Sequence, residues 1–137
     1  MSANPPRSSD TLLNRLTELG IAHKTYHHAP LFTVEQSKAE RGKLEGGHVK
    51  NLFLRDKKRR MWLITVDEER AVDLKALRNR LGAQGNLSFG SSDLLMQALG
   101  VAPGAVTPFA VINDPDCLVT LVLDRTVLLR DQVNAHP

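Results

Sequence analysis

The chain has 137 residues, of which 42% are hydrophobic and 24% are charged, and these proportions are usual for a globular protein with one core. They exclude a disordered chain, a collagen-like repeat and a coiled coil, and no apolar run is long enough to span a membrane. A single cysteine excludes an internal disulfide and a multi-cysteine metal site, and the formal net charge of +3 permits a nucleic-acid partner without requiring one.

We expect a single cytoplasmic domain. A chain of this length usually folds as one domain, which we place at residues 10–137. Residues 1–9 are rich in serine and proline and are predicted to be a flexible tail. The start of the chain lacks the apolar stretch of a signal peptide, and a cytoplasmic location is therefore expected.

The first third of the chain predicts two helices and a strand. Asp10 is expected to cap a helix that has leucines along one face and ends at Gly20. Residues 21–27 are typical of a short strand. Residues 33–36 fit a capping box, which predicts a second helix that ends near Arg41.

The centre of the chain predicts a β-hairpin followed by a helix. Residues 48–55 and 61–66 have the composition of strands and flank a charged turn. Asp73 is expected to cap a helix that Gly82 closes. Residues 87–89 are interpreted as a further short strand.

The last third predicts another helix and more strands. Ser92 is expected to cap a helix that ends at Gly100. Residues 109–113 and 118–124 are interpreted as strands on either side of a turn, and residues 127–129 as an edge strand. Because helices and strands are interspersed and several strands form hairpins, we expect an α/β fold, of the α+β kind, with a mixed sheet.

Standard catalytic motifs are missing from the sequence. We find no nucleophile elbow, zinc-protease motif, Walker loop or dinucleotide fingerprint. The adjacent His27 and His28 would point to opposite faces of a strand, so no metal site is predicted.

Three segments carry residues that a functional site could use. Lys50 lies in an apolar strand row, which is costly unless its ammonium has an anionic partner or reaches water. The loop at 100–108 contains two glycines and two prolines. It either brings backbone N–H groups to a ligand oxygen or connects a helix to a strand. The basic turn at 55–60 either contacts phosphate or is a solvated hairpin tip.

In combination, these segments resemble a known family. The strings K-N-L-F-L-R-D at 50–56 and G-A-V-T-P-F at 104–109 are the most specific ones. The matching segments are 28–35, 50–56, 72–75, 87–89, 99–101, 104–109 and 133–137. The chain resembles the YbaK and prolyl-tRNA-synthetase-associated editing domains, and within them the freestanding deacylases of alanyl-tRNA(Pro).

The resemblance implies a fold, an activity and partners. The fold is a mixed, partly closed β-sheet surrounded by helices. The activity is hydrolysis of the ester between alanine and the terminal adenosine of tRNA(Pro), without a cofactor or metal. The implied partner is tRNA(Pro) carrying alanine, with prolyl-tRNA synthetase or an elongation factor as a second partner to test, and no membrane. Relatives usually continue past the H-P pair, so the chain that ends at Pro137 is expected to be either shortened or a naturally short member.

The resemblance also implies a set of site residues. The catalytic group comprises Lys50, Gly104 and His136. The residues expected to bind the aminoacyl end of the substrate are Leu31, Phe32, Thr33, Val34, Asn51, Ala105, Thr107 and Pro108. Apart from the resemblance, the charge of the basic turn predicts that Lys57, Lys58, Arg59 and Arg60 contact tRNA.

A synthetase built for proline cannot easily reject the smaller alanine, because missing methylenes change binding by only about 1–3 kcal/mol. A second site, with a pocket that admits only small side chains, would allow the mischarged alanine to be hydrolysed. We expect Lys50 and Gly104 to border one cleft, with a backbone N–H near Gly104 donating to the oxyanion. Lys50 is expected to hold the phosphate or ribose of the terminal adenosine. Two alternatives stay open: removal of cysteine or serine by the same chemistry, and a non-catalytic tRNA- or synthetase-binding module of the same fold.

Overall fold

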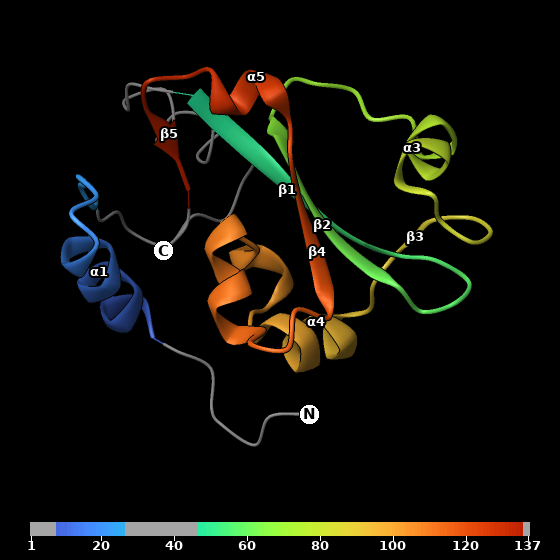
Figure 1. Ribbon diagram of the computed structural model, residues 1–137, viewed down its shortest axis with the longest axis horizontal. Coiled ribbons are helices and arrows are strands. Elements are labelled where there is room, and N and C mark those ends of the chain that lie inside the picture. The colour runs from blue at the N-terminus through green and yellow to red at the C-terminus, as the bar shows by residue number, and fades with distance from the viewer. Residues whose placement is uncertain (1–7, 27–46, 136–137) are drawn as a thin grey trace.

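The computed structural model describes residues 8–26 and 47–135 (Figure 1). Outside the described residues lie the predicted helix at 33–41, the predicted pocket residues Leu31–Val34, and His136. The strands are β1 (Gly47–Arg55), β2 (Met61–Asp67), β3 (Ser88–Phe89), β4 (Val119–Leu123) and β5 (Val133–Asn134). The helices are α1 (Ser9–Glu18), α3 (Leu74–Leu81), α4 (Ser92–Leu99) and α5 (Arg125–Leu128), with 3₁₀ turns η1 (Pro103–Ala105) and η2 (Pro108–Asn113).

Helix α1 begins slightly earlier than the sequence predicts. The side chain of Ser8, and not that of Asp10, accepts a hydrogen bond from the N–H of Thr11 at 3.2 Å. Both residue types cap helices well, and Asp10 instead lies in the first turn, where its negative charge suits the helix dipole. Ser9, the last residue of the predicted tail at 1–9, is therefore the first residue of the helix.

The predicted hairpin is confirmed, and Asp56 fixes its turn. One carboxylate oxygen of Asp56 accepts from the N–H groups of Lys58 and Arg60, both at 2.9 Å. The other oxygen accepts from the N–H of Gln84, also at 2.9 Å. Burial acts to raise the pKa of Asp56, but the three N–H donors and the positive charge of Arg60 together lower that pKa below its ordinary value. The hairpin tip is thereby attached to the segment before β3.

The sheet is mixed, as predicted. Strand β2 pairs antiparallel with β1 and parallel with β4. On its other side, β1 pairs antiparallel with β3 near its end and parallel with β5 near its start. Among the described residues the strands follow the open path β3-β1-β2-β4, with β5 beside β1, and helices lie around them (Figure 1).

The two faces of the sheet bury separate clusters, because side chains alternate along each strand. The first, which we call the α4 face, packs Phe53 and Leu63 against helix α4 and turn η2. The second, the α3 face, packs Leu54, Trp62 and Ile64 against helix α3 and the segment before β3. Each residue of β1 therefore belongs to one of two different environments.

The helices α3 and α4 are confirmed, with one change of cap. The Asp73 carboxylate accepts from the N–H of Lys75 at 3.0 Å, and Gly82 ends α3 in the left-handed conformation, with φ of 67°. In α4 the capping side chain is that of Ser91, which accepts from the N–H of Leu94 at 3.1 Å. The predicted cap, Ser92, is instead the first helical residue.

Three predicted strands are wrong. Residues 21–26 form no strand, residues 108–113 form η2, and most of 127–129 lies in α5. For the last two of these segments the cause is local, because Thr107 and Pro108 start a 3₁₀ turn and Asp124 caps α5. The predicted strand at 118–124 is confirmed as β4.

Candidate active site

The described part of the candidate site centres on Asn51, a polar residue in the middle of β1. Its Nδ2 donates to the carbonyl of Val106 at 3.1 Å, and its Oδ1 accepts from the hydroxyl of Thr65 at 2.7 Å. Val106 is 55 residues further along the chain. The structure therefore brings the predicted K-N segment and the predicted Gly104–Pro108 loop together, through Asn51.

The Gly104–Pro108 loop runs from the end of the 3₁₀ turn η1 to the first residue of η2, and Val106 and Thr107 lie between the two turns. Thr107 is buried, and its hydroxyl accepts from the N–H of Phe109 at 3.4 Å, which fixes the start of η2. Gly104 is exposed, and no atom of the described residues lies within 4 Å of the position a β-carbon would take. The backbone at Gly104 is therefore open to a ligand.

Lys50 is adjacent to Asn51 but lies on the other face of the sheet. It pairs with Val66, a member of the α3-face cluster, whereas Asn51 pairs with Thr65 next to Leu63 of the α4 face. The side chain of the half-buried Lys50 makes no hydrogen bond or ion pair with any other residue that the structure describes. Because the strand separates the Lys50 side chain from the loop, the expected single cleft bordered by Lys50 and Gly104 is not found among the described residues.

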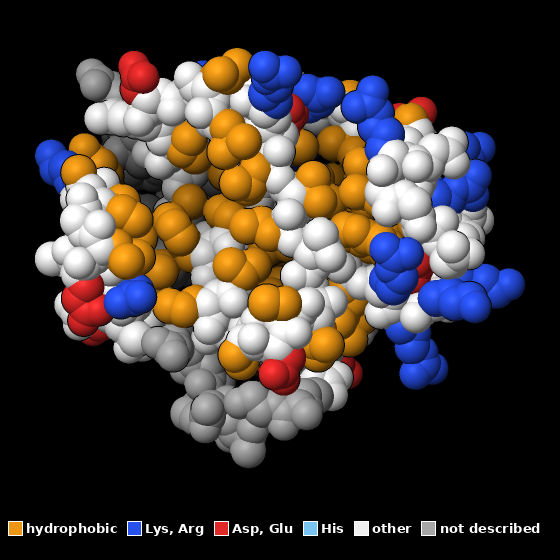
Figure 2. Space-filling view, in the orientation of Figure 1, with side chains coloured by type: hydrophobic (Ala, Val, Ile, Leu, Met, Phe, Trp, Pro, Cys, Tyr) orange, Lys and Arg blue, Asp and Glu red, His pale blue; other side chains and the backbone are white. Residues whose placement is uncertain are grey.

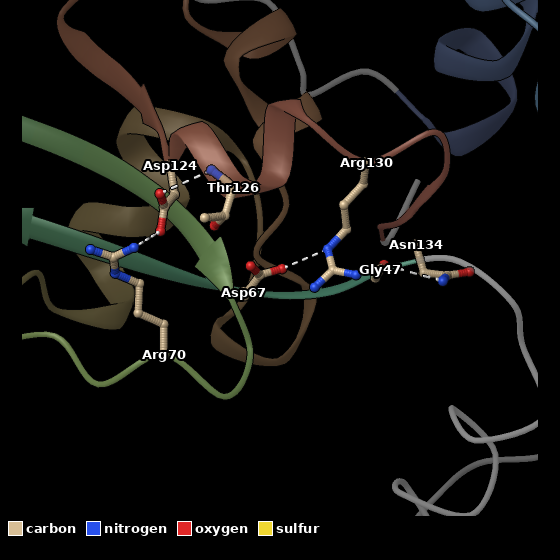
Figure 3. Close-up of polar contacts among 7 residues, drawn as sticks. All are labelled: Gly47, Asp67, Arg70, Asp124, Thr126, Arg130 and Asn134. Atoms are coloured by element: carbon tan, nitrogen blue, oxygen red, sulfur yellow. Dashed lines mark hydrogen bonds and ion pairs between the residues drawn. The ribbon is translucent and has the colours of Figure 1, made fainter.

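The segment before His136 is anchored on the start of β1 (Figure 3). Gly47 pairs with Val133, and His48 pairs with Asn134. The Asn134 amide also donates to the Gly47 carbonyl at 3.2 Å. The C-terminal V-N-A-H-P string therefore begins on the same strand as Lys50 and Asn51.

Two ion pairs hold the ends of the strands beside this anchor (Figure 3). Arg130 Nε lies 3.0 Å from Asp67 Oδ1, and Arg70 Nη1 lies 2.9 Å from Asp124 Oδ2. The Arg130 side chain crosses Gly47 so closely that a β-carbon there would collide with it. The Thr126 side chain, as hydrogen-bond donor, and Arg130 lower the pKa of Asp67 below its ordinary value, against the opposing effect of burial.

The basic turn is a cluster of exposed cationic side chains, of which Arg60 has protein partners and the others do not among the described residues. Lys57, Lys58 and Arg59 make no side-chain hydrogen bond or ion pair within the described ranges. Arg60 instead donates to the Gly82 carbonyl at 3.2 Å and lies over the Trp62 ring, 5.1 Å from its centre. Lysines and arginines gather on the side of the molecule where Figure 1 places the hairpin turn and α3 (Figure 2). This side of the molecule is thus suited to an anionic partner.

Neither a metal-binding group nor a membrane-spanning helix is found in the part of the chain that the structure describes. No three His, Cys, Asp or Glu side chains in residues 8–26 and 47–135 are grouped so that they could hold a metal ion. No helix in these ranges is long and apolar enough to cross a bilayer.

Comparison with known proteins identifies the family. Residues 28–137 match the model of the aminoacyl-tRNA editing domain. The chain belongs to this family. It is therefore an aminoacyl-tRNA deacylase, a hydrolase, as the sequence resemblance implied.

Curated relatives of this editing domain carry names from prolyl-tRNA editing. The chain is 37% identical over 133 residues to the prolyl-tRNA editing protein ProX of Acetoanaerobium sticklandii, and the match covers 95% of this chain and 79% of the relative. It is also 38% identical over 130 residues to the bovine (Bos taurus) prolyl-tRNA synthetase associated domain-containing protein 1, covering 92% and 75% of the two chains.

Solved structures share the fold of the editing domain. A hypothetical protein of known crystal structure superposes with a TM-score of 0.70 at 19% identity, covering 92% of this chain and 82% of the other, which supports the fold alone. The crystal structure of a proposed trans-editing enzyme for prolyl-tRNA synthetase gives a TM-score of 0.53 at 25% identity, covering 70% and 57% of the two chains.

The structure of the editing domain adds residues that the sequence reasoning missed. Thr65 and Val106 bind the Asn51 amide from opposite sides, and Arg130 braces the start of β1. The single threonine in the apolar string M-W-L-I-T-V of β2 could have indicated a buried polar contact. Nothing in the sequence showed which loop would provide the carbonyl partner of Asn51.

Proposed function

We propose that this editing domain acts in trans, in the cytoplasm, and hydrolyses alanyl-tRNA(Pro) to alanine and free tRNA(Pro). The family membership and the names of the relatives support this substrate. In the reaction, the oxygen of a water molecule bonds to the ester carbonyl carbon and the bond from that carbon to the ribose oxygen breaks. One proton of the water ends on the ribose oxygen.

The observation that carries the proposal is the open backbone at Gly104, held in place through the Asn51–Val106 hydrogen bond. A peptide N–H near Gly104 would donate to the oxyanion that develops on the ester carbonyl. A fixed loop is needed, because such a donor stabilises the transition state only when it is already oriented. Ala105, Thr107 and Pro108 complete the loop and are proposed to border the aminoacyl group.

Lys50 is proposed to bind the tRNA end and not the ester carbonyl. The alternation of β1 places it away from the loop, and its ammonium has no partner among the described residues. A phosphate of the tRNA end would supply the anionic partner that a half-buried lysine requires. His136 and the residues Leu31–Val34 keep their implied roles in the pocket as predictions.

The basic turn is proposed as a second tRNA contact. The side chains of Lys57, Lys58 and Arg59 are exposed and make no hydrogen bond or ion pair with the described residues, so binding phosphate would break no such contact. Arg60, which bonds Gly82 and covers Trp62, would contribute less. Because the net charge is only +3, free tRNA would be attracted weakly. Prolyl-tRNA synthetase or an elongation factor is therefore proposed as a second partner that delivers the substrate.

A deacylation panel tests this function. The purified chain is incubated with tRNA charged with alanine, cysteine, serine or proline, and release of the amino acid is followed over time. We expect multiple turnovers with alanyl-tRNA(Pro) and none with prolyl-tRNA(Pro). Preference for cysteine or serine would assign the same chemistry to another small substrate. Binding of tRNA without turnover would instead indicate a non-catalytic module.

A further inference from the structure

The Thr65 hydroxyl is a buried polar group in an apolar strand. Thr65 is 1% exposed, and the residues on either side of it in β2 are also buried. Valine has nearly the same shape and would fill this position without a hydroxyl to satisfy. A buried hydroxyl costs stability unless it is hydrogen-bonded, and the bond it forms here is to Asn51 Oδ1 at 2.7 Å.

This bond and the Val106 carbonyl together fix which way the Asn51 amide points. A side-chain amide has an acceptor on one side and a donor on the other. Thr65 donates to Oδ1, and Nδ2 then faces the Val106 carbonyl. With the amide reversed, two oxygens would face each other at Val106. Loss of the Thr65 hydroxyl would leave Oδ1 without its donor and the amide held by the Val106 carbonyl alone.

Thr65 is itself held rigidly. Its carbonyl accepts from the N–H of Asp124 at 2.9 Å, and β2 is paired on both sides at this position, with Asn51 on β1 and Leu123 on β4. The backbone that carries the hydroxyl is therefore held by a strand on each side. At the other end of this series of bonds, Val106 directly follows η1 and, together with Thr107, connects it to η2.

We propose that Thr65 is a positioning residue of the editing reaction: its hydroxyl orients the Asn51 amide, which holds the Val106 carbonyl and so sets the geometry of the Gly104–Pro108 loop. The inference rests on the proposed function, since it assigns this loop to the bound ester. Thr65 does not touch the substrate and acts through Asn51.

The test compares single-turnover and steady-state deacylation by Thr65→Val and Thr65→Ser, with Thr120→Val, at an exposed threonine of β4, as the matched control. We expect Thr65→Val to lower kcat about tenfold, with KM changed less than about twofold, because a loop that must be pre-oriented acts on the transition state. Thr65→Ser retains the hydroxyl and should restore most of kcat. Thr120→Val should match the wild type.

Two further measurements separate positioning from a general loss of structure. In the Asn51→Ala background, adding Thr65→Val should cost no further activity, because the relay is already broken. The NMR signals of the Asn51 side-chain amide should move in Thr65→Val and stay in place in Thr65→Ser. Wild-type kcat in folded Thr65→Val, or full additivity with Asn51→Ala, would overturn the proposal. A wild-type chain that hydrolyses no aminoacyl-tRNA of the panel would overturn the proposed function together with it, whereas an active wild type with an equally active Thr65→Val overturns the Thr65 role alone.

Discussion

Asp56 shows how one carboxylate organises the hairpin tip, and its replacement should weaken the fold in a pH-dependent way. Its two oxygens accept three backbone N–H groups. An asparagine offers one acceptor oxygen, so Asp56→Asn would set its amide donors against the N–H of Gln84 or against those of Lys58 and Arg60. We expect a lower urea midpoint for Asp56→Asn at neutral pH, measured by circular dichroism.

The lowered pKa of Asp56 gives the sign of the pH effect. Its stabilising contribution is fully present above the carboxyl pKa of the unfolded chain and is lost as pH falls through the lower pKa of the folded state. The difference between wild type and Asp56→Asn should therefore shrink on acidification. Asp116→Asn, at an exposed turn residue, should show no such change. A difference that stays constant down to acid unfolding would refute the role of the charge.

A substitution at Gly104 should affect substrate binding without affecting stability. No described atom lies near the position of an added β-carbon, and its φ is not in the left-handed region. Gly104→Ala should therefore leave the melting temperature unchanged or slightly raised, because alanine reduces the entropy of the unfolded chain. If the ester rests on this backbone, kcat/KM for alanyl-tRNA(Pro) should fall by about tenfold or more.

The control for this substitution is Gly82→Ala. Gly82 has open space but a φ of 67°, so alanine there should lower stability by about 1 kcal/mol and leave kcat/KM unaltered. Unchanged turnover in Gly104→Ala would mean that the substrate does not approach this part of the loop.

At the scale of elements, some of the structure could be read from local signals and some could not. The hairpin β1–β2 and the helix from Asp73 to Gly82 follow from strand composition, a charged turn and clear caps. Residues 109–112 form an unbroken apolar run, which periodicity cannot assign to a strand or a helix. The preceding Thr107 and Pro108 decide it as a 3₁₀ turn.

The same limit applies to the candidate site. The Asn51–Val106 bond joins residues that are 55 positions apart, and no local pattern specifies such a pairing. The opposite orientations of Lys50 and Asn51 did follow from strand alternation. What the sequence could not provide is which helix or loop covers each face of the sheet.

The cap of α4 offers a test at the element scale. Two serines precede the apolar run, and the structure assigns the cap to Ser91, whose oxygen accepts from the Leu94 N–H at 3.1 Å. Ser91→Ala should lower the free energy of unfolding by about 1 kcal/mol. Ser92→Ala should be nearly neutral, because this residue lies inside the first turn. Denaturant titrations of both variants check the assignment, and the reverse order of effects would reject it.

At the scale of the whole molecule, the position of charge matters more than its sum. The formal net charge is only +3, yet cations are concentrated around the hairpin turn and α3 (Figure 2). An anionic polymer would therefore meet an uneven surface, with its strongest attraction on one side. This arrangement allows tRNA binding to be strengthened locally without a strongly basic protein.

Salt dependence measures that local contact. Replacing Lys57, Lys58 and Arg59 together by Gln should weaken binding of tRNA(Pro) and reduce the slope of log K against log salt by about two, since each neutralised phosphate contributes about 0.7–0.9 to it. The matched control changes the same net charge elsewhere, with Gln at Arg15, Lys24 and Arg125, which lie in and after α1 and in α5. Long-range attraction would weaken equally in both triple variants, whereas direct phosphate contact lowers the slope only in the hairpin variant. Equal slopes in the two variants would therefore leave the turn as a solvated tip.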